Sequence, residues 1–245
     1  MNNSFQKFYD SNPSYIKRRD IGSKFRKNYV EEIKFWKNKY LSSILLEDLE
    51  INNIVEIGSA TGDLISSFPS KVPMENRYGV DISKKNIEAA KELYPQVNFY
   101  CGSLDDFIET KGKDISIDII ILSDILEHIV NDCEILKIAG DVSKFVLLNL
   151  PLEKCLKTLF RSYGINDFAG HLRAYNFNDA IKLINNANLK IINSKTKYYC
   201  KENLYKKHLN SSNKGHLKLI IIKTIDKFFY KIFNVKNLFA LLVKK

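Results

Sequence analysis

The stretch that decides the fold reads Ile54-Val55-Glu56-Ile57-Gly58-Ser59-Ala60-Thr61-Gly62-Asp63-Leu64. A short run of β-forming residues before a glycine predicts a buried strand, and the residues after Gly62 predict the start of a helix. Gly58 permits a tight turn, the side chains of Ser59 and Ala60 are small, and Gly62 lets the helix begin close to the strand. A ligand can therefore approach main-chain N–H groups at this helix N-terminus.

The same alternation of strand and helix continues along the chain. The predicted strands are Ile54–Ile57, Tyr78–Asp81, Val97–Tyr100, Ile117–Leu122, Phe145–Leu150, Leu189–Ser194 and Leu238–Val243. The predicted helices are Asp63–Phe68, Ser83–Leu93 with Ser83 as N-cap, Leu104–Glu109, Asp132–Ile138 and Asn178–Asn186. Strands interleaved with helices are typical of βα units, so the sequence predicts an α/β fold with an open, doubly wound, seven-stranded sheet.

Two segments fall outside this alternation. Residues 1–49 form a predicted N-terminal helical cap, because apolar residues recur at helical spacing within Lys24–Leu46. Residues 201–236 form a predicted basic helical insertion, in which His216–Phe233 reads as an amphipathic helix. The predicted core then comprises residues 50–200 and a last strand within 237–245.

Composition bounds the class of protein. The 245 residues carry a formal net charge of +10 and 45% hydrophobic residues, which excludes wholesale disorder. Neither a bilayer-spanning stretch nor a signal peptide is recognisable, and the four Cys show no paired spacing. We therefore expect a cytoplasmic protein without disulfides or a zinc clip.

The positive charge is unevenly distributed. Residues 191–245 carry a balance of +11 and residues 1–42 a balance of +6, whereas residues 43–190 carry −7. A basic surface of this kind attracts an anionic partner: a phosphorylated acceptor, a membrane surface or nucleic acid. The alternative is a solvated lysine-rich surface. Peripheral attachment to the inner membrane face through residues 216–233 stays open, as does packing of that helix on the domain or on a partner subunit.

Glycine spacing distinguishes between cofactor classes. A dinucleotide site has the pattern G-x-G-x-x-G, whereas residues 56–62 read E-x-G-x-A-x-G. This turn resembles motif I of class I S-adenosylmethionine-dependent methyltransferases. The resemblance continues in order through Asp81, the D-x-L-E-H turn that ends Ile119–His128, the strand Phe145–Pro151, the segment Gly170–Tyr175 and the terminal strand Leu238–Lys245. It extends to bacterial methyltransferases of surface-polysaccharide and small-molecule pathways, and it implies a mostly parallel, Rossmann-like sheet with an antiparallel last strand.

The resemblance implies a binding site for S-adenosyl-L-methionine. The residues expected to contact it are Glu56, Gly58, Ser59, Gly62, Asp81, Ile82, Ser103, Leu104, Ser123 and Asp124. Asp81 stands where the family holds the ribose. Ser103 replaces the family's usual Asp after the third strand, so Ser103 or Asp105 would accept the hydrogen bond from the adenine amino group. Arg18, Arg19 and Arg26 are candidates for the methionine carboxylate, although we expect them to be exposed.

Two histidines are the candidate catalytic residues. His128 and His171 fall in segments expected to rim the pocket, and an imidazole suits removal of a hydroxyl proton near neutral pH. Arg173 and Tyr175 are candidate substrate-binding residues beside His171. The alternative for His128 is a structural hydrogen bond to a backbone carbonyl.

A metal site is a second interpretation of the same region. Asp124, Glu127, His128 and His171 form an oxygen and nitrogen set suited to Mg²⁺ or Mn²⁺. We do not expect a divalent metal as cofactor, and retain this set as an alternative.

The sequence therefore predicts a methyltransferase, with O-methylation of a small or glycan-type acceptor as the leading hypothesis. The acceptor could be a phosphorylated or nucleotide-linked sugar. An RNA or tRNA methyltransferase and a non-catalytic S-adenosylmethionine-binding protein are the alternatives. Nucleic acid is the less favoured partner, because the excess charge lies outside the predicted cofactor-binding core.

Overall fold

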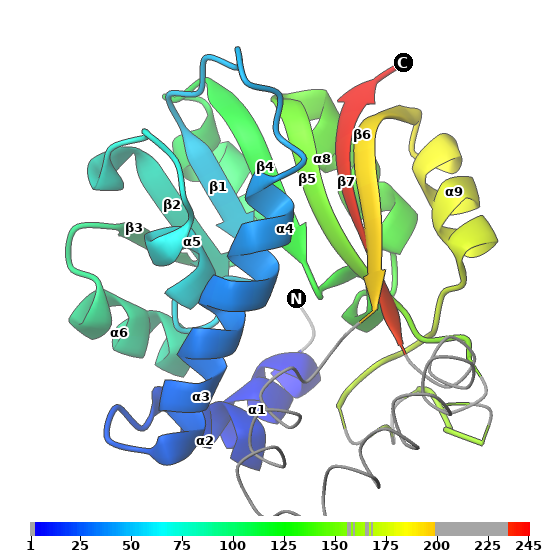
Figure 1. The fold of residues 1–245 in the computed structure, drawn as a ribbon. Coiled ribbons are helices and arrows are strands. Elements are labelled where there is room, and N and C mark those ends of the chain that lie inside the picture. Colours follow the sequence, from blue (N-terminus) through cyan, green and yellow to red (C-terminus); the bar gives the residue numbers. More distant parts are fainter. Residues whose placement is uncertain (1–2, 156–157, 159, 165–166, 168, 199–234) are drawn as a thin grey trace, which may run out of the picture.

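The protein is built on one seven-stranded sheet. The computed structural model describes residues 3–155, 158, 160–164, 167, 169–198 and 235–245. The strands are β1 (Ile54–Ile57), β2 (Arg77–Asp81), β3 (Asn98–Cys101), β4 (Ile117–Ser123), β5 (Ser143–Leu152), β6 (Leu189–Tyr198) and β7 (Lys236–Lys244). Their order is β3-β2-β1-β4-β5-β7-β6, and β7 runs antiparallel to both of its neighbours, β5 and β6. The predicted α/β fold with a mostly parallel sheet and an antiparallel last strand is confirmed (Figure 1).

Strand order reverses beside β1. The chain passes from β1 outward to β2 and β3, then returns to pair β4 on the other side of β1. Ile57 at the end of β1 is paired with Val80 of β2 and with Leu122 of β4. The carboxyl ends of three strands therefore lie together at a topological switch point, which is where open α/β sheets bind ligands.

Helices cover both faces of the sheet. The first face carries α7 (Leu104–Phe107), α8 (Asp132–Val142) and α9 (Phe177–Asn186), and the second carries α5 (Asp63–Ser67) and α6 (Lys84–Leu93). Apolar residues of the central strands are divided between the two cores; in β4, for example, Ile120 faces the first core and Ile121 the second. Strands buried on both faces explain the nearly continuous apolar runs in the sequence.

Some predicted boundaries were too short. Strand β6 continues four residues past Ser194, and α8 continues four residues past Ile138. The predicted helix Leu104–Glu109 is an α-helix only to Phe107 and then becomes the π-helical turn η3 (Ile108–Gly112). Ser83 caps α6 as expected, because its hydroxyl accepts a hydrogen bond from the Asn86 N–H at 3.1 Å. Two short 3₁₀ turns, η2 (Met74–Asn76) and η4 (Leu126–His128), complete the core.

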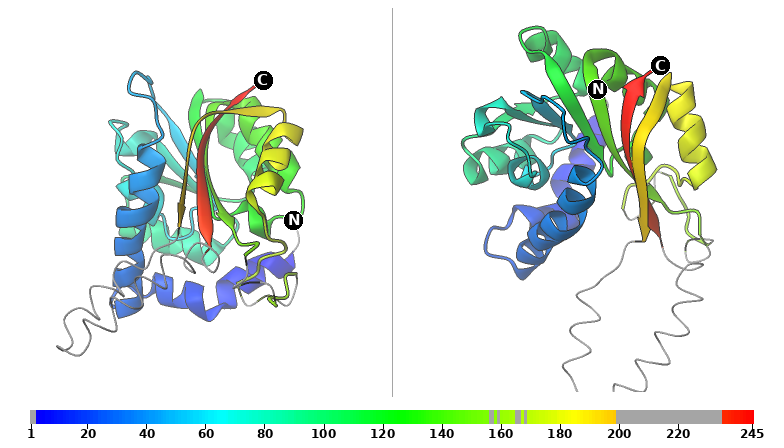
Figure 2. Two further views of the ribbon diagram at one scale, coloured as in Figure 1. Left: turned by 45° about the vertical axis from the view of Figure 1, so that its right-hand side comes forward. Right: turned by 45° about the horizontal axis from the view of Figure 1, so that its top comes forward.

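The N-terminal segment is helical and belongs to the second face. It comprises α1 (Asn3–Ser11), α2 (Pro13–Arg19), α3 (Lys24–Glu32), the π-helical turn η1 (Ile33–Asn38) and α4 (Lys39–Ser42). Ile33, Leu41 and Ile44 are buried in the second core, to which α5 and α6 also contribute. Figure 1 shows α1 and α2 across the edge of the sheet where β1 and β4 end, and Figure 2 shows α3 and α9 on opposite sides of the sheet.

The amphipathic helix expected within 216–233 lies outside the described residues, as does nearly all of the predicted insertion 201–236. Among the residues that the structure does describe, no helix is long and apolar enough to cross a bilayer.

Candidate active site

A cavity of about 860 Å³ lies at the carboxyl ends of β1, β2 and β4. Nine of the predicted cofactor-binding residues line it: Glu56, Gly58, Ser59, Asp81, Ile82, Ser103, Leu104, Ser123 and Asp124. Both predicted catalytic residues, His128 and His171, line it as well. The cap supplies much of the remaining wall through Tyr9, Tyr15, Arg18, Trp36 and Lys37. The volume is in the range of small-molecule sites.

Gly58 and Gly62 have different tasks in the turn after β1. Both have left-handed backbone angles, with φ of 73° and 76°. A Cβ on Gly58 would lie 2.6 Å from Ile125 Cδ1, so this turn packs directly on the turn after β4. A Cβ on Gly62 would collide with the ring of Phe99 instead. Gly62 is not among the residues that line the cavity, and it allows α5 to pack closely on Phe99 of β3. Its contact with the cofactor stays a prediction.

Asp81 is a buried carboxylate at the cavity wall. Its Oδ2 accepts a hydrogen bond from the Ala60 N–H at 2.9 Å, and its Oδ1 accepts one from the Ser83 N–H at 2.8 Å. Burial raises the pKa of Asp81, while these two N–H groups oppose the rise. The carboxylate is thereby fixed between the turn after β1 and the start of α6, with lone pairs left for a ligand hydroxyl.

Ser103 is occupied by a helix cap. Its hydroxyl donates to Asp106 Oδ2 at 2.7 Å and accepts from the Asp106 N–H at 3.2 Å, which forms a capping box at the start of α7. Asp105, the other residue considered for the adenine amino group, is exposed and lines the cavity. Of the two side chains, Asp105 is therefore the better placed to accept a hydrogen bond from a ligand.

Lys37 is a cavity residue that the sequence did not reveal. Its Nζ lies 2.6 Å from Asp124 Oδ2. Burial acts against the charge of Lys37, but Asp124 and Tyr29 together raise its pKa. Glu56 lies in the same cavity, where burial raises its pKa to about 8 although Lys37 and the Ile65 N–H act against the rise. The periodicity of apolar residues in the cap did not indicate that Lys37 lines the cavity.

None of the three candidate arginines is exposed: Arg26 is buried, and Arg18 and Arg19 are half-buried. Arg26 is 5% exposed and makes a buried ion pair with Asp63, with Nη2 and Oδ1 2.6 Å apart. Arg18 lines the cavity and lies between the rings of Tyr15 and Tyr29, 4.6 and 4.3 Å from their centroids. Arg19 donates to Asn86 Oδ1 at 2.7 Å. Our expectation of exposure was wrong because the cap packs these side chains against the core.

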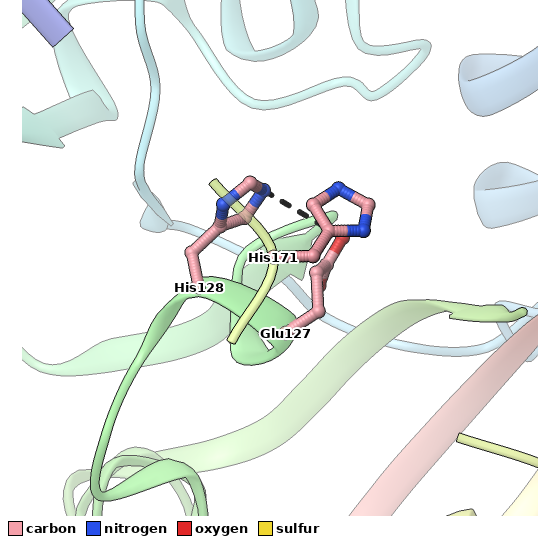
Figure 3. Close-up of side chains that lie close together, drawn as sticks. All are labelled: Glu127, His128 and His171. Carbon is pink, nitrogen blue, oxygen red and sulfur yellow. Dashed lines mark ion pairs between the residues drawn. The ribbon is translucent and has the colours of Figure 1, made fainter. Parts of the chain in front are cut away.

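The turn after β4 and the segment around Gly170 bring two histidines together. The rings of His128 and His171 lie 4.6 Å apart and almost perpendicular, and Glu127 lies beside both (Figure 3). Burial, and then His171, lower the pKa of His128 to about 4, so this ring is neutral at pH 7. Burial, followed by the charge of Asp124, raises the pKa of Glu127.

Hydrogen bonds fix the orientation of both rings. His128 Nδ1 lies 3.0 Å from the Gly170 carbonyl oxygen, which can only accept, so Nδ1 carries the proton. His171 Nδ1 donates to Glu153 Oε2 at 2.7 Å. An imidazole that carries its proton on Nδ1 has a lone pair on Nε2.

Glu153 is a site residue that the sequence analysis missed. Besides its bond to His171, Glu153 accepts hydrogen bonds from Arg161 Nη1 at both carboxylate oxygens, at 3.0 and 3.1 Å. Arg161 also pairs with Asp167 at 2.7 Å. The only available signal was its position directly after β5. Because its partners are distant in sequence, no local pattern indicated this network.

Arg173 and Tyr175 are directed elsewhere. Arg173 pairs with Asp132 at 2.5 Å, and Tyr175 is 4% exposed with its hydroxyl 2.6 Å from Asp132 Oδ2. Neither side chain lines the cavity. The structure does not support their predicted substrate contact, because both side chains tie this segment to the start of α8.

Comparison with known proteins identifies the family and the fold of this chain. A family model described as a methyltransferase domain matches residues 50–200. No curated protein matches the sequence significantly. Magnesium protoporphyrin IX methyltransferase from Synechocystis PCC 6803, solved with bound SAM, has a TM-score of 0.56 at 12% identity and covers 99% of this chain and 96% of its own. A SAM dependent methyltransferase from Archaeoglobus fulgidus has a TM-score of 0.56 at 14% identity, with 92% and 97% covered.

Proposed function

This chain belongs to the methyltransferase domain family and is a class I S-adenosylmethionine-dependent methyltransferase, and we propose that it methylates a hydroxyl oxygen of a small or glycan-type acceptor. The observation that carries the acceptor proposal is the pair of imidazoles at the cavity wall. Both rings use Nδ1 as a donor, so each can offer Nε2 toward an acceptor hydroxyl. A hydroxyl is a poor nucleophile until a general base removes its proton, whereas an amine or a thiolate has less need of a general base.

The cavity residues fit the methyl donor. Ser59 Oγ is buried without a hydrogen-bond partner among the described residues, which suits a site completed by a ligand. Asp81 would accept from the ribose hydroxyls and Asp105 from the adenine amino group. Arg18 would pair with the methionine carboxylate, and Glu56 and Asp124 would face the positive charges. When bound, S-adenosylmethionine supplies an activated methyl group on a sulfonium.

The chain's own part in the reaction is positioning, limiting the access of bulk water and removal of a proton. The cap covers part of the cavity over the ends of β1 and β4, which restricts the access of bulk water to the reacting groups. Alignment of donor and acceptor provides most of the rate advantage in a displacement of this kind. His128 and His171 would act on the acceptor proton by taking it at Nε2.

The acceptor class is supported by two features of the chain. Its motifs resemble those of bacterial surface-polysaccharide and small-molecule methyltransferases, and its tail carries the excess of lysine. We therefore place phosphorylated or nucleotide-linked sugars first, in a cytoplasmic setting, with a basic rim or an anionic membrane surface nearby.

Transfer of a labelled methyl group tests the proposal. Purified full-length protein is incubated with methyl-labelled S-adenosylmethionine and, separately, with sugar nucleotides, phosphosugars or bulk RNA. We expect label in a sugar and about a 100-fold or greater loss of turnover for His171→Asn, with donor affinity unchanged. Salt-sensitive labelling of RNA would establish an RNA methyltransferase instead. Tight donor binding without transfer to any acceptor would indicate a non-catalytic protein.

A further inference from the structure

We propose that Glu127, His128 and His171 form a binding site for a divalent first-row transition-metal cation. One ligand atom from each residue lies within 4.8 Å of the other two. Figure 3 shows the three side chains side by side, with His171 reaching the turn that carries Glu127 and His128 from a distant part of the chain. The Leu172 N–H donates to the Glu127 carbonyl oxygen at 2.8 Å, which holds His171 against that turn.

Glu127 is the residue that requires a ligand. It is 1% exposed, and neither of its carboxyl oxygens has a hydrogen-bond partner among the residues that the structure describes. Its Oε1 lies 3.9 Å from His128 Nε2, which is too long for a hydrogen bond. A buried carboxyl group without a partner is costly, and a cation between Glu127 and the two rings would satisfy it.

The two histidines are held as metal ligands usually are. A metal-binding imidazole donates its other N–H to a carbonyl or carboxylate, which fixes the tautomer and the ring orientation. His128 does so to the Gly170 carbonyl, and His171 does so to Glu153. Glu153 is in turn held by Arg161, so the support extends one further layer from the site.

Asp124 does not belong to this site. Its Oδ2 pairs with Lys37 at 2.6 Å, and its Oδ1 accepts from Asn149 Nδ2 at 3.0 Å. The ligand set is therefore two nitrogens and one carboxylate rather than the oxygen-richer set suggested by the sequence. Imidazole ligands favour Mn²⁺, Co²⁺ or Zn²⁺ over Mg²⁺, which prefers oxygen ligands and retains water.

The remaining coordination positions face the cavity, because His128, His171 and Glu127 all line it. Three protein ligands with an open position are typical of catalytic rather than structural cation sites. Metal–nitrogen bonds of about 2.1 Å allow two ligand atoms to be at most about 4.2 Å apart, so small rotamer adjustments complete the site.

The cation would orient the acceptor, a role that rests on the proposed O-methylation. An acceptor hydroxyl coordinated to the cation loses its proton more easily. The O–H bond breaks, its electron pair stays on oxygen, and the proton passes to water. An acceptor with neighbouring oxygen atoms, such as a sugar diol, would fill two open positions at once.

Cation binding is measured without donor or acceptor, so its outcome does not depend on the acceptor screen. Full-length protein stripped with chelator is titrated calorimetrically with MnCl₂, ZnCl₂ and MgCl₂, and Mn²⁺ binding is followed by the loss of its free electron paramagnetic resonance signal. We expect micromolar or tighter affinity for Zn²⁺ or Mn²⁺ and at least 100-fold weaker Mg²⁺ binding. Affinities of 1 mM or weaker for all three cations would overturn the site.

Variants locate the ligands. Glu127→Gln keeps the shape of the side chain, and it and His171→Asn should each weaken Mn²⁺ binding by about 100-fold. Glu153→Gln should weaken it about 10-fold through the ring that it orients. Glu134→Gln removes an exposed carboxylate from the same cavity, and this variant should bind Mn²⁺ with the affinity of the unaltered protein. Unfolding midpoints verify that each variant is folded. Unchanged affinity in folded Glu127→Gln would refute the proposal.

Turnover with an identified sugar acceptor separates the two proposals. Loss of methyl transfer in EDTA, restored by Mn²⁺ or Zn²⁺, supports the cation's part in orienting the acceptor. Full turnover in EDTA would remove the cation from the reaction and leave O-methylation by direct proton transfer to a histidine intact.

Discussion

Buried ionisable side chains define the character of the cavity at the residue scale. Glu56, Asp81 and Glu127 are 9% exposed or less, and burial raises the pKa of each. Lys37 enters the same space and pairs with Asp124. Perturbed carboxyl groups that gather in one cavity are characteristic of functional sites. The acidic wall also suits a donor that carries positive charge.

Gly58 should not tolerate a side chain. Its φ of 73° costs a non-glycine residue about 1–2 kcal/mol, and a Cβ would lie 2.6 Å from Ile125 Cδ1. We expect Gly58→Ala to lower affinity for S-adenosylmethionine by at least about 10-fold, as measured by calorimetry. Gly22→Ala is the control, because its Cβ would lie 3.8 Å from the nearest atom. Equal affinity of both variants would show that the turn does not hold the donor.

Glu56 should make stability depend on pH in the absence of ligand. Its folded pKa of about 8 exceeds the ordinary value of 4.5, so the folded state retains a proton that the unfolded state has lost between these values. The contribution is fully present below pH 4.5 and is lost as pH rises through about 8. The free energy of unfolding should therefore fall with pH across this window, by at most about 1.4 kcal/mol per unit.

Urea unfolding at pH 5, 6.5 and 8 measures this contribution of Glu56. The amide in Glu56→Gln has no proton to lose in this range. The excess of the unaltered protein over the variant in free energy of unfolding should therefore shrink as pH rises, until the variant is the more stable of the two. Parallel pH profiles for the two proteins would show that Glu56 is ionised throughout.

At the scale of elements, the cap and the turn after β1 depend on each other. Arg26 of α3 forms a buried ion pair with Asp63, the first residue of α5, and Tyr94 donates to the same carboxylate at 2.8 Å. The cap is thereby fastened to the helix that follows the glycine turn. An element that closes the cavity is thus anchored at the turn expected to bind the donor.

Removing Arg26 should loosen that attachment. Arg26→Ala leaves Asp63 buried without its cation, which typically costs about 3–5 kcal/mol. We expect a loss of that order in the free energy of unfolding, together with weaker donor binding. Lys27→Ala changes an exposed residue of the same helix and should alter stability by less than about 0.5 kcal/mol. A loss below about 1 kcal/mol for Arg26→Ala would mean that the cap is held by its apolar contacts.

At the scale of the whole molecule, the excess of positive charge is unevenly distributed along the chain. The net charge of +10 arises from the two ends of the sequence, whereas residues 43–190 are acidic on balance. The cap places its basic residues Lys37 and Arg26 against acidic partners of the core. Residues 191–245 carry a balance of +11, and this charge sets where an anionic acceptor or surface would be attracted.

Sedimentation with vesicles tests the tail. We expect the full-length protein to bind phosphatidylserine-containing vesicles but not neutral ones, with binding weakened by 0.5 M salt, because each basic residue near an anionic surface contributes about 1 kcal/mol. Deletion of residues 203–236 should reduce this binding by at least about 10-fold. Equal binding by both proteins would exclude the tail as a membrane contact.

The sequence by itself determined the order of strands and helices, the glycine turn at Gly58 and the position of Asp81 at the end of β2. These features follow from apolar periodicity and backbone sterics, which act over a few neighbouring residues. The tertiary structure alone decided which side chains meet. It joined His171 to Glu127, assigned Asp124 to Lys37, turned Tyr175 away from the cavity and supplied Glu153. Such contacts depend on how distant segments pack, and packing leaves no local pattern in the sequence from which a partner can be read.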